Sequence, residues 1–129
     1  MEEMEAYWLI VAHMLGDYVL QNHWMGVVKT QKWLPAIVHA ILYTVPFAVF
    51  FGICWALVPI GVTHLFIDRY SLVKRYWVDF WGIGKAGWLP AKFGFKMDDA
   101  PPFIGLWLAF IADNTIHLVI NGASIHFLG

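Results

Sequence analysis

The chain has 129 residues, of which 60% are hydrophobic, 18% aromatic and only 13% charged. The length predicts one domain, and a soluble domain would have about 25% charged residues, so the composition indicates an integral membrane protein. The net charge of −1 argues against a nucleic-acid-binding surface, and the single cysteine excludes a disulfide framework and a Cys-rich metal site. The acidic start, MEEME, argues against a cleavable signal peptide.

Apolar segments predict four transmembrane helices. The first covers about residues 4–22. The next segment, Leu34 to Ile67, lacks Asp, Glu, Lys and Arg and is too long for one span of roughly 17–25 residues. It predicts a hairpin of helices 35–52 and 54–76, and the fourth helix, 101–121, follows DDAPP. The predicted fold class is an all-α integral membrane protein, a four-transmembrane-helix bundle that forms one transmembrane domain over residues 1–129.

The basic residues predict the orientation of these helices. All eight Lys and Arg lie in two places, Lys29 to Lys32 and Arg69 to Lys96. The positive-inside rule places both segments in the cytoplasm and both termini outside. Residues 77–100, rich in aromatic residues and glycine, are predicted to be a cytoplasmic interfacial loop. The predicted location is the bacterial cytoplasmic (inner) membrane, as a multi-pass protein.

Polar residues recur inside these apolar helices at a spacing of four. The pairs are His13 and Asp17 in AHMLGDYVLQ, His64 and Asp68 in THLFID, and Asp113 and His117 in DNTIH. Residues four apart share one helix face. The second helix adds His39, so every predicted helix contributes a histidine to the inner half of the bundle.

This pattern predicts a metal site. A carboxylate inside a membrane helix costs a few kcal/mol or more to insert, and a bound cation would neutralise several of them together. Imidazole and carboxylate ligands suit a divalent metal, with Zn preferred here and Fe or Mn as alternatives, as one or two ions. The predicted ligands are His13, Asp17, His39, His64, Asp68, Asp113 and His117, with Gln21 and Asn114 beside them to contact substrate. The simpler alternative is that the pairs only hold the helices together.

The motifs AHMLGDYVLQ, THLFID and DNTIH, with a histidine early in the second helix, resemble a family of small bacterial and phage membrane proteins catalogued as domain of unknown function 3307. The resemblance covers nearly the whole chain. It implies that His13, Asp17, Gln21, His39, His64, Asp68, Asp113 and His117 are the signature residues, and Asn114 stands where Gln is often expected. More distantly, the chain is similar to LexA-regulated inner-membrane proteins described as metal-dependent hydrolases.

Three functions remain open from the sequence. The first is a membrane-embedded metal-dependent hydrolase that acts on a lipid or lipid-linked phosphoester or ester at the cytoplasmic leaflet, with Asp17 or Asp113 as general base. The second is a non-enzymatic protein that binds metal or protons for transport or sensing. The third is a phage-encoded membrane protein that binds a host membrane protein. A homo-oligomer is also expected, because four short helices enclose little space.

Overall fold

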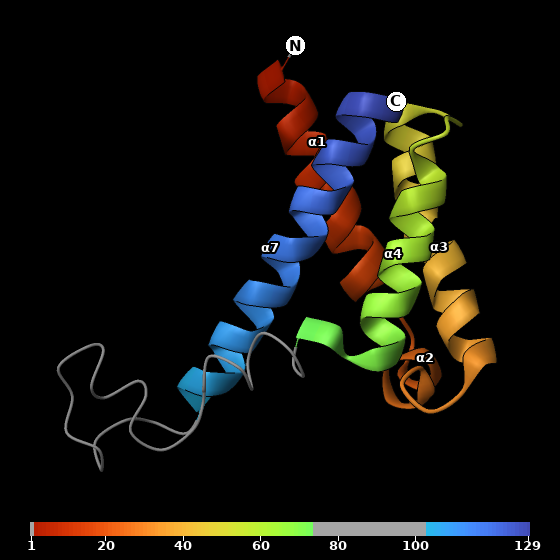
Figure 1. Cartoon of the computed structure of the whole chain (residues 1–129), viewed down its shortest axis with the longest axis vertical. Coiled ribbons are helices and arrows are strands. Elements are labelled where there is room, and N and C mark those ends of the chain that lie inside the picture. The colour runs from red at the N-terminus through yellow and green to blue at the C-terminus, as the bar shows by residue number, and fades with distance from the viewer. Residues whose placement is uncertain (1, 74–102) are drawn as a thin grey trace, which may run out of the picture. The chain divides into compact units, whose positions relative to one another are not determined.

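The computed structural model describes residues 2–73 and 103–129 (Figure 1). All regular structure in these ranges is helical. The elements are α1 (Glu2–Met14), the π-helix η1 (Leu15–Val19), α2 (His23–Val28), α3 (Trp33–Phe51), α4 (Leu57–Tyr70) and α7 (Phe103–Leu128). The predicted interfacial loop, residues 77–100, lies outside the described ranges.

The chain divides into two compact units. The first consists of Met1–Ser71 and Ile116–Gly129, and the second of Leu72–Thr115. Helix α7 contributes its first half to the second unit and its second half to the first. The candidate site described below is built within the first unit.

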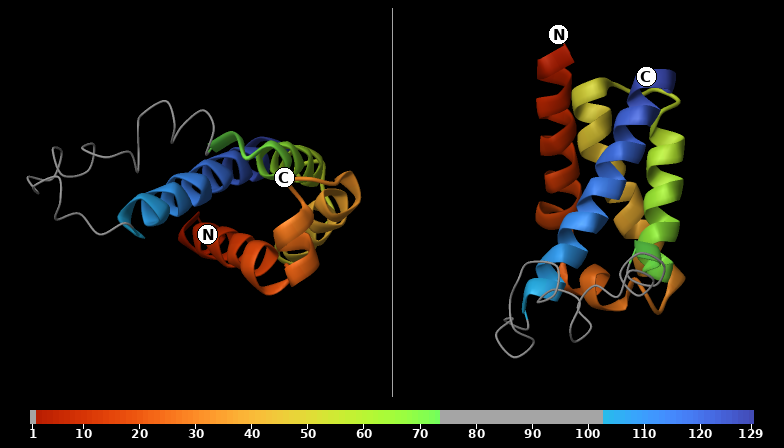
Figure 2. Two further views of the ribbon diagram at one scale, coloured as in Figure 1. Left: turned by 90° about the horizontal axis from the view of Figure 1, so that it is seen from below. Right: turned by 60° about the vertical axis from the view of Figure 1, so that its left-hand side comes forward.

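In the first unit, α1, α3, α4 and the second half of α7 run side by side (Figures 1 and 2). The short helix α2 lies at the end of the unit farthest from the start of α1. Helix α3 packs against α4, α1 and η1. It ends at Phe51, and the next residue, Gly52, has φ 83° and donates its N–H to Ala48 O at 3.0 Å. A glycine suits this position because a side chain is disfavoured at positive φ.

The apolar core connects three of these helices. Its fully buried members are Ala12 from α1, Tyr43 and Phe47 from α3, Ala56 before α4, and Ile60 within α4. Gly16 allows η1 to approach α3 closely, because a Cβ at this position would lie 2.6 Å from Tyr43 Cδ2 and 3.0 Å from Tyr43 O. The core therefore joins directly to the segment that carries Asp17.

The prediction of a four-transmembrane-helix bundle is wrong. Within the described residues, α3 is the one helix long and apolar enough to cross a membrane. Helices α1 and α4 have 13 and 14 residues. At 1.5 Å per residue each extends about 20 Å, against a hydrocarbon core of about 30 Å.

The helix bounds also differ from those expected. The expected helix 4–22 is α-helical only to Met14 and continues as a π-helix to Val19, after which the chain turns. The six-residue helix α2 has no counterpart among the expected elements. Asn22 caps it, accepting from the Met25 N–H at 2.9 Å. This segment matters for the site because it supplies Gln21 and Lys29.

Candidate metal centre

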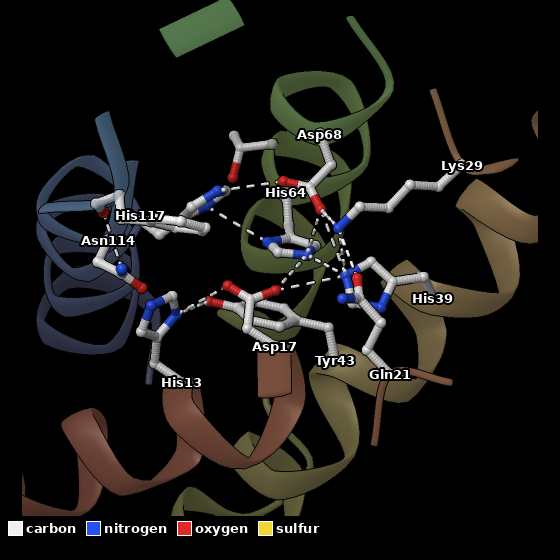
Figure 3. Close-up of polar contacts among 12 residues, drawn as sticks. His13, Asp17, Gln21, Lys29, His39, Tyr43, His64, Asp68, Asn114 and His117 are labelled. Carbon is white, nitrogen blue, oxygen red and sulfur yellow. Dashed lines mark hydrogen bonds and ion pairs between the residues drawn. The ribbon is translucent and has the colours of Figure 1, made fainter. Parts of the chain in front are cut away.

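Four side chains from three helical elements of the first unit converge on one point (Figure 3). Asp17 comes from η1, His39 from α3, and His64 and Asp68 from α4. One ligand atom from each lies within 4.8 Å of all the others, so the group could hold a metal ion. The histidines are fully buried, at 1% and 0% exposure, and the carboxylate side chains are 11% and 10% exposed. The carboxylates are therefore the accessible side of the cluster.

Five of the six distances between these atoms fit a tetrahedral shell. His39 Nε2 and His64 Nε2 lie 3.0 Å apart. Both lie 3.3 Å from Asp17 Oδ1, and they lie 3.3 and 3.5 Å from Asp68 Oδ2. Ligands at about 2.0–2.1 Å from a tetrahedral zinc ion are about 3.3 Å from one another. Five of the six edges are thus close to the expected length.

Local structure explains how Asp17 reaches this point. It lies in the π-helical turn Leu15–Val19, in which each turn contains more residues than in an α-helix. Such turns are rare and frequently occur at functional sites. Gly16, the residue before it, permits the close contact with Tyr43 described above. The turn also ends the helix before Gln21, so the side chains at 13, 17 and 21 do not follow one α-helical face.

A histidine supports the α4 residues from outside the cluster. His117, in the second half of α7, places its Nδ1 3.3 Å from His64 Nδ1 and its Nε2 3.4 Å from Asp68 Oδ1. In one set of tautomers, His64 Nδ1–H donates to His117 Nδ1, and His117 carries its own proton on Nε2, the atom 3.4 Å from Asp68 Oδ1. That set leaves His64 Nε2 unprotonated, as a metal ligand must be.

A second buried network centres on Tyr43. Its hydroxyl lies 2.7 Å from His13 Nδ1 and accepts from Asn121 Nδ2 at 2.6 Å. His13 Nδ1 is also 3.7 Å from Asp17 Oδ2. All three network side chains are almost completely buried. His13, predicted as a ligand, is thus not among the four converging residues. It approaches Asp17 at Oδ2, the carboxylate oxygen that does not face His39 and His64.

A lysine also faces the cluster. Lys29 Nζ forms an ion pair with Asp68 Oδ2 and donates to Gln21 Oε1 at 2.6 Å. It lies 3.4 Å from His39 Nε2 (Figure 3). Gln21 was expected beside the site, and the structure places its amide on the lysine.

The environment keeps three of the four potential ligands in the protonation states that metal binding requires. Burial opposes ionisation of Asp17, but the hydrogen bond from His39 and the nearby His64 and His13 together outweigh it and lower the carboxyl pKa. Burial also opposes ionisation of Asp68, yet contacts with His117 and His39 hold its pKa well below the usual range. Burial lowers the pKa of His64 to about 3, although Asp68 opposes this shift. Both carboxylates are thus anionic and His64 is neutral at pH 7.

His39 differs from His64. Burial disfavours its charged form, but hydrogen bonds to Asp17 and Asp68 prevail and raise its pKa. The ring nitrogen Nε2 makes the polar contacts of His39, and the buried Nδ1 has no hydrogen-bond partner within residues 2–73 and 103–129. Without a metal, His39 therefore carries a proton on Nε2, and this N–H donates to the carboxylates of Asp17 and Asp68. The donor set fits a cation, which would take that proton's place.

The remaining predicted residues, Asp113 and Asn114, belong to the second unit. They lie on the first half of α7, where Asn114 Nδ2 donates to Phe110 O at 2.8 Å. Two residues of the first unit, Tyr43 and Asn121, were absent from the predicted site, whereas Lys29 was expected to contact a headgroup. A signal for both was present, because Tyr43 follows His39, and Asn121 follows His117, at the same spacing of four.

Comparison with known proteins agrees with the resemblance read from the motifs. Residues 6–125 match the family described as Protein of unknown function (DUF3307). No curated protein and no solved structure matches the chain. Since the match covers nearly the whole chain, including every residue of the candidate metal centre, the protein belongs to the DUF3307 family.

Proposed function

We propose that the chain is a divalent-metal-dependent hydrolase. The observation that carries this proposal is the convergence of His39 Nε2, His64 Nε2 and one oxygen each of Asp17 and Asp68, with each nitrogen 3.0–3.5 Å from the other three atoms. Imidazole and carboxylate donors without thiolate suit Zn, with Fe and Mn as alternatives. The distant similarity to LexA-regulated hydrolases stays a prediction from the motifs.

The roles of the residues follow from their outer contacts. A catalytic zinc site keeps three protein ligands and leaves one position for water. We assign His39, His64 and Asp68 as the ligands, because His117 supports both His64 and Asp68. A divalent cation at such a site lowers the pKa of a bound water toward neutrality. Asp17 Oδ1, the fourth of the converging atoms, would yield its position to that water and accept the water proton as general base. Asp113 stays an alternative base predicted from the sequence.

The proposed substrate is a lipid or lipid-linked phosphoester or ester at the bacterial inner membrane. Large apolar side chains point outward along α1, α3 and α4, among them Ile10 (50% exposed), Ile41 (60%), Val49 (72%) and Val58 (55%). Exposed apolar surface of this extent is typical of contact with a membrane or a partner protein. Further copies of the chain, or a host membrane protein if the chain is phage-encoded, would cover the same surface.

A second candidate function is metal or proton binding without catalysis, in transport or sensing. The observation that favours it is the depth of the site: both histidines are at most 1% exposed and neither carboxylate exceeds 11%. A fully enclosed four-ligand ion is typical of structural rather than catalytic zinc.

Metal analysis and lipid turnover separate these functions. Purified protein should contain about one equivalent of metal, which His64→Ala should lose and His23→Ala, at an exposed histidine of α2, should keep. Asp17→Asn should retain metal in the proposed hydrolase but stop conversion of phospholipid vesicles, followed by mass spectrometry. Metal without turnover in any variant would favour transport or sensing. Absence of metal from wild-type protein, even after incubation with Zn, Fe or Mn salts, would refute the metal centre.

A further inference from the structure

The ammonium group of Lys29 is directed at the candidate metal centre. Its Nζ pairs with Asp68 Oδ2 and lies 3.4 Å from His39 Nε2, two of the four converging atoms. Its third partner is Gln21 Oε1, at 2.6 Å. The lysine side chain is 17% exposed, so most of it is enclosed beside the site.

A metal ion and this ammonium group would compete for the same carboxylate oxygen. A zinc–oxygen bond of about 2.0–2.2 Å and a charge-assisted hydrogen bond of about 2.8 Å place the two cations at most about 5 Å apart. Like charges at that distance repel strongly where water is excluded. Lys29 is therefore the counter-ion of Asp68 when no metal is bound, and metal binding would displace it.

The displaced ammonium would remain near the site. Lys29 directly follows α2 and has a flexible four-carbon stem, while Gln21 precedes the same helix and offers a second acceptor. The ammonium thus stays tethered close to Asp68 but loses its anionic partner. An ammonium in this condition favours an anionic oxygen of a ligand held at the metal.

We propose that Lys29 recognises an anionic phosphate oxygen of the substrate, and that metal binding releases it from Asp68 for this role. The inference rests on the proposed metal centre and narrows the substrate from esters in general to phosphoesters. Lys29 is in this view a substrate-binding residue, with Gln21 as its positioning partner.

The first test measures competition with the metal. Zn²⁺ affinity is determined by calorimetric titration of metal-free protein, with a chelator as competitor, for wild type, Lys29→Met and Lys32→Met. Lys32 is an exposed lysine at the start of α3, so its variant controls for loss of one positive charge. We expect Lys29→Met to bind Zn²⁺ at least tenfold more tightly and Lys32→Met to bind as wild type does. Unchanged or weaker binding in Lys29→Met would overturn the proposal.

The second test measures anion recognition in the zinc-loaded protein. Binding of inorganic phosphate and of short-chain phosphatidylglycerol is titrated separately for the same three proteins and for Lys29→Arg. Lys29→Met should weaken binding of at least one of them tenfold or more, while Lys29→Arg and Lys32→Met stay within about threefold of wild type. If only phosphate binding depends on Lys29, the recognised group is free phosphate. If phosphatidylglycerol binding depends on it, the recognised group is a lipid headgroup. Equal binding by wild type and Lys29→Met would overturn the role in recognition.

The tests also separate this inference from the proposed function. If no protein binds Zn²⁺, both fail together. If wild type and all variants bind Zn²⁺ equally, and phosphate binding is the same with and without Lys29, the role proposed for Lys29 fails but the metal centre stands. Circular dichroism of each variant verifies the helical fold before titration.

Discussion

Tyr43 stacks directly on His64, with ring centroids 3.5 Å apart and ring planes 6° from parallel. The tyrosine ring thereby covers one face of a candidate ligand, while its hydroxyl contacts His13 and Asn121. Because both side chains are fully buried, this contact fixes the orientation of the imidazole. Tyr43 therefore links the apolar core to the candidate metal centre.

Removing the Tyr43 hydroxyl should destabilise the protein without removing the stacked ring. Tyr43→Phe leaves Asn121 Nδ2 and His13 Nδ1 buried without this partner, which predicts a loss of about 1–3 kcal/mol in the free energy of unfolding. Urea titration measures the loss. Tyr7→Phe, at a tyrosine that is 58% exposed, serves as control and should change little. Equal stability of both variants would show that the hydroxyl network contributes nothing.

A methyl group at residue 16 should disturb the site through α3. The Cβ of Gly16→Ala would lie 2.6 Å from a ring carbon of Tyr43 and 3.0 Å from its carbonyl oxygen, so η1 and α3 would have to separate. We expect a loss of about 1–3 kcal/mol of stability and weaker Zn²⁺ binding. Gly122→Ala is the control, because its Cβ would make an ordinary contact at 3.4 Å with Leu9 Cδ2. It should be neutral or slightly stabilising, as alanine favours helix.

His13 should act on the metal through its neighbours. Its Nδ1 contacts Tyr43 and approaches Asp17, whereas His39 and His64 direct Nε2 into the cluster. Loss of an outer partner typically weakens metal binding about 10–100-fold. His13→Gln should therefore retain measurable Zn²⁺ binding, while His64→Gln loses it under the same titration. Complete loss in His13→Gln would instead identify His13 as a ligand, as the sequence motif predicted.

The low pKa of His64 predicts acid sensitivity of the metal-free protein. Burial lowers this pKa to about 3, whereas histidine in an unfolded chain has a pKa of about 6.5. As the pH falls below about 6.5, the unfolded chain gains a proton at His64 and the folded chain does not, so stability falls by up to about 1.4 kcal/mol per pH unit. His39 adds nothing to this fall, because its raised pKa gives stability that is complete below about 6.5 and is lost only as pH rises through the folded value.

Urea unfolding in EDTA, between about pH 6 and pH 4.5, measures this slope. His64→Gln should reduce this slope, relative to wild type, by the amount that corresponds to uptake of about one proton on unfolding. The exposed histidine variant His23→Ala should leave it unchanged. A slope that is the same in His64→Gln and wild type would contradict a neutral, buried His64.

Helical spacing accounts for what the sequence could predict about the site. His64 and Asp68 lie four apart on α4 and contact the same point, with Nε2 3.5 Å from Oδ2. The apolar composition likewise predicted an all-α fold, and all regular structure in the described residues is helical. These inferences succeed because side chains one turn apart on a helix share a face whatever the surrounding fold.

The sequence by itself therefore determined that the chain is helical and which residues carry metal-binding chemistry, since both depend on local periodicity and residue type. Tertiary structure decided which of them meet: the π-helical turn redirects Asp17, Tyr43 holds His13 outside the cluster, and α2 brings Lys29 onto Asp68. It also decided helix length, and thereby overturned the four predicted spans. These features depend on contacts between residues far apart in the chain, such as Lys29 with Asp68 and Tyr43 with Asn121, which no local pattern specifies.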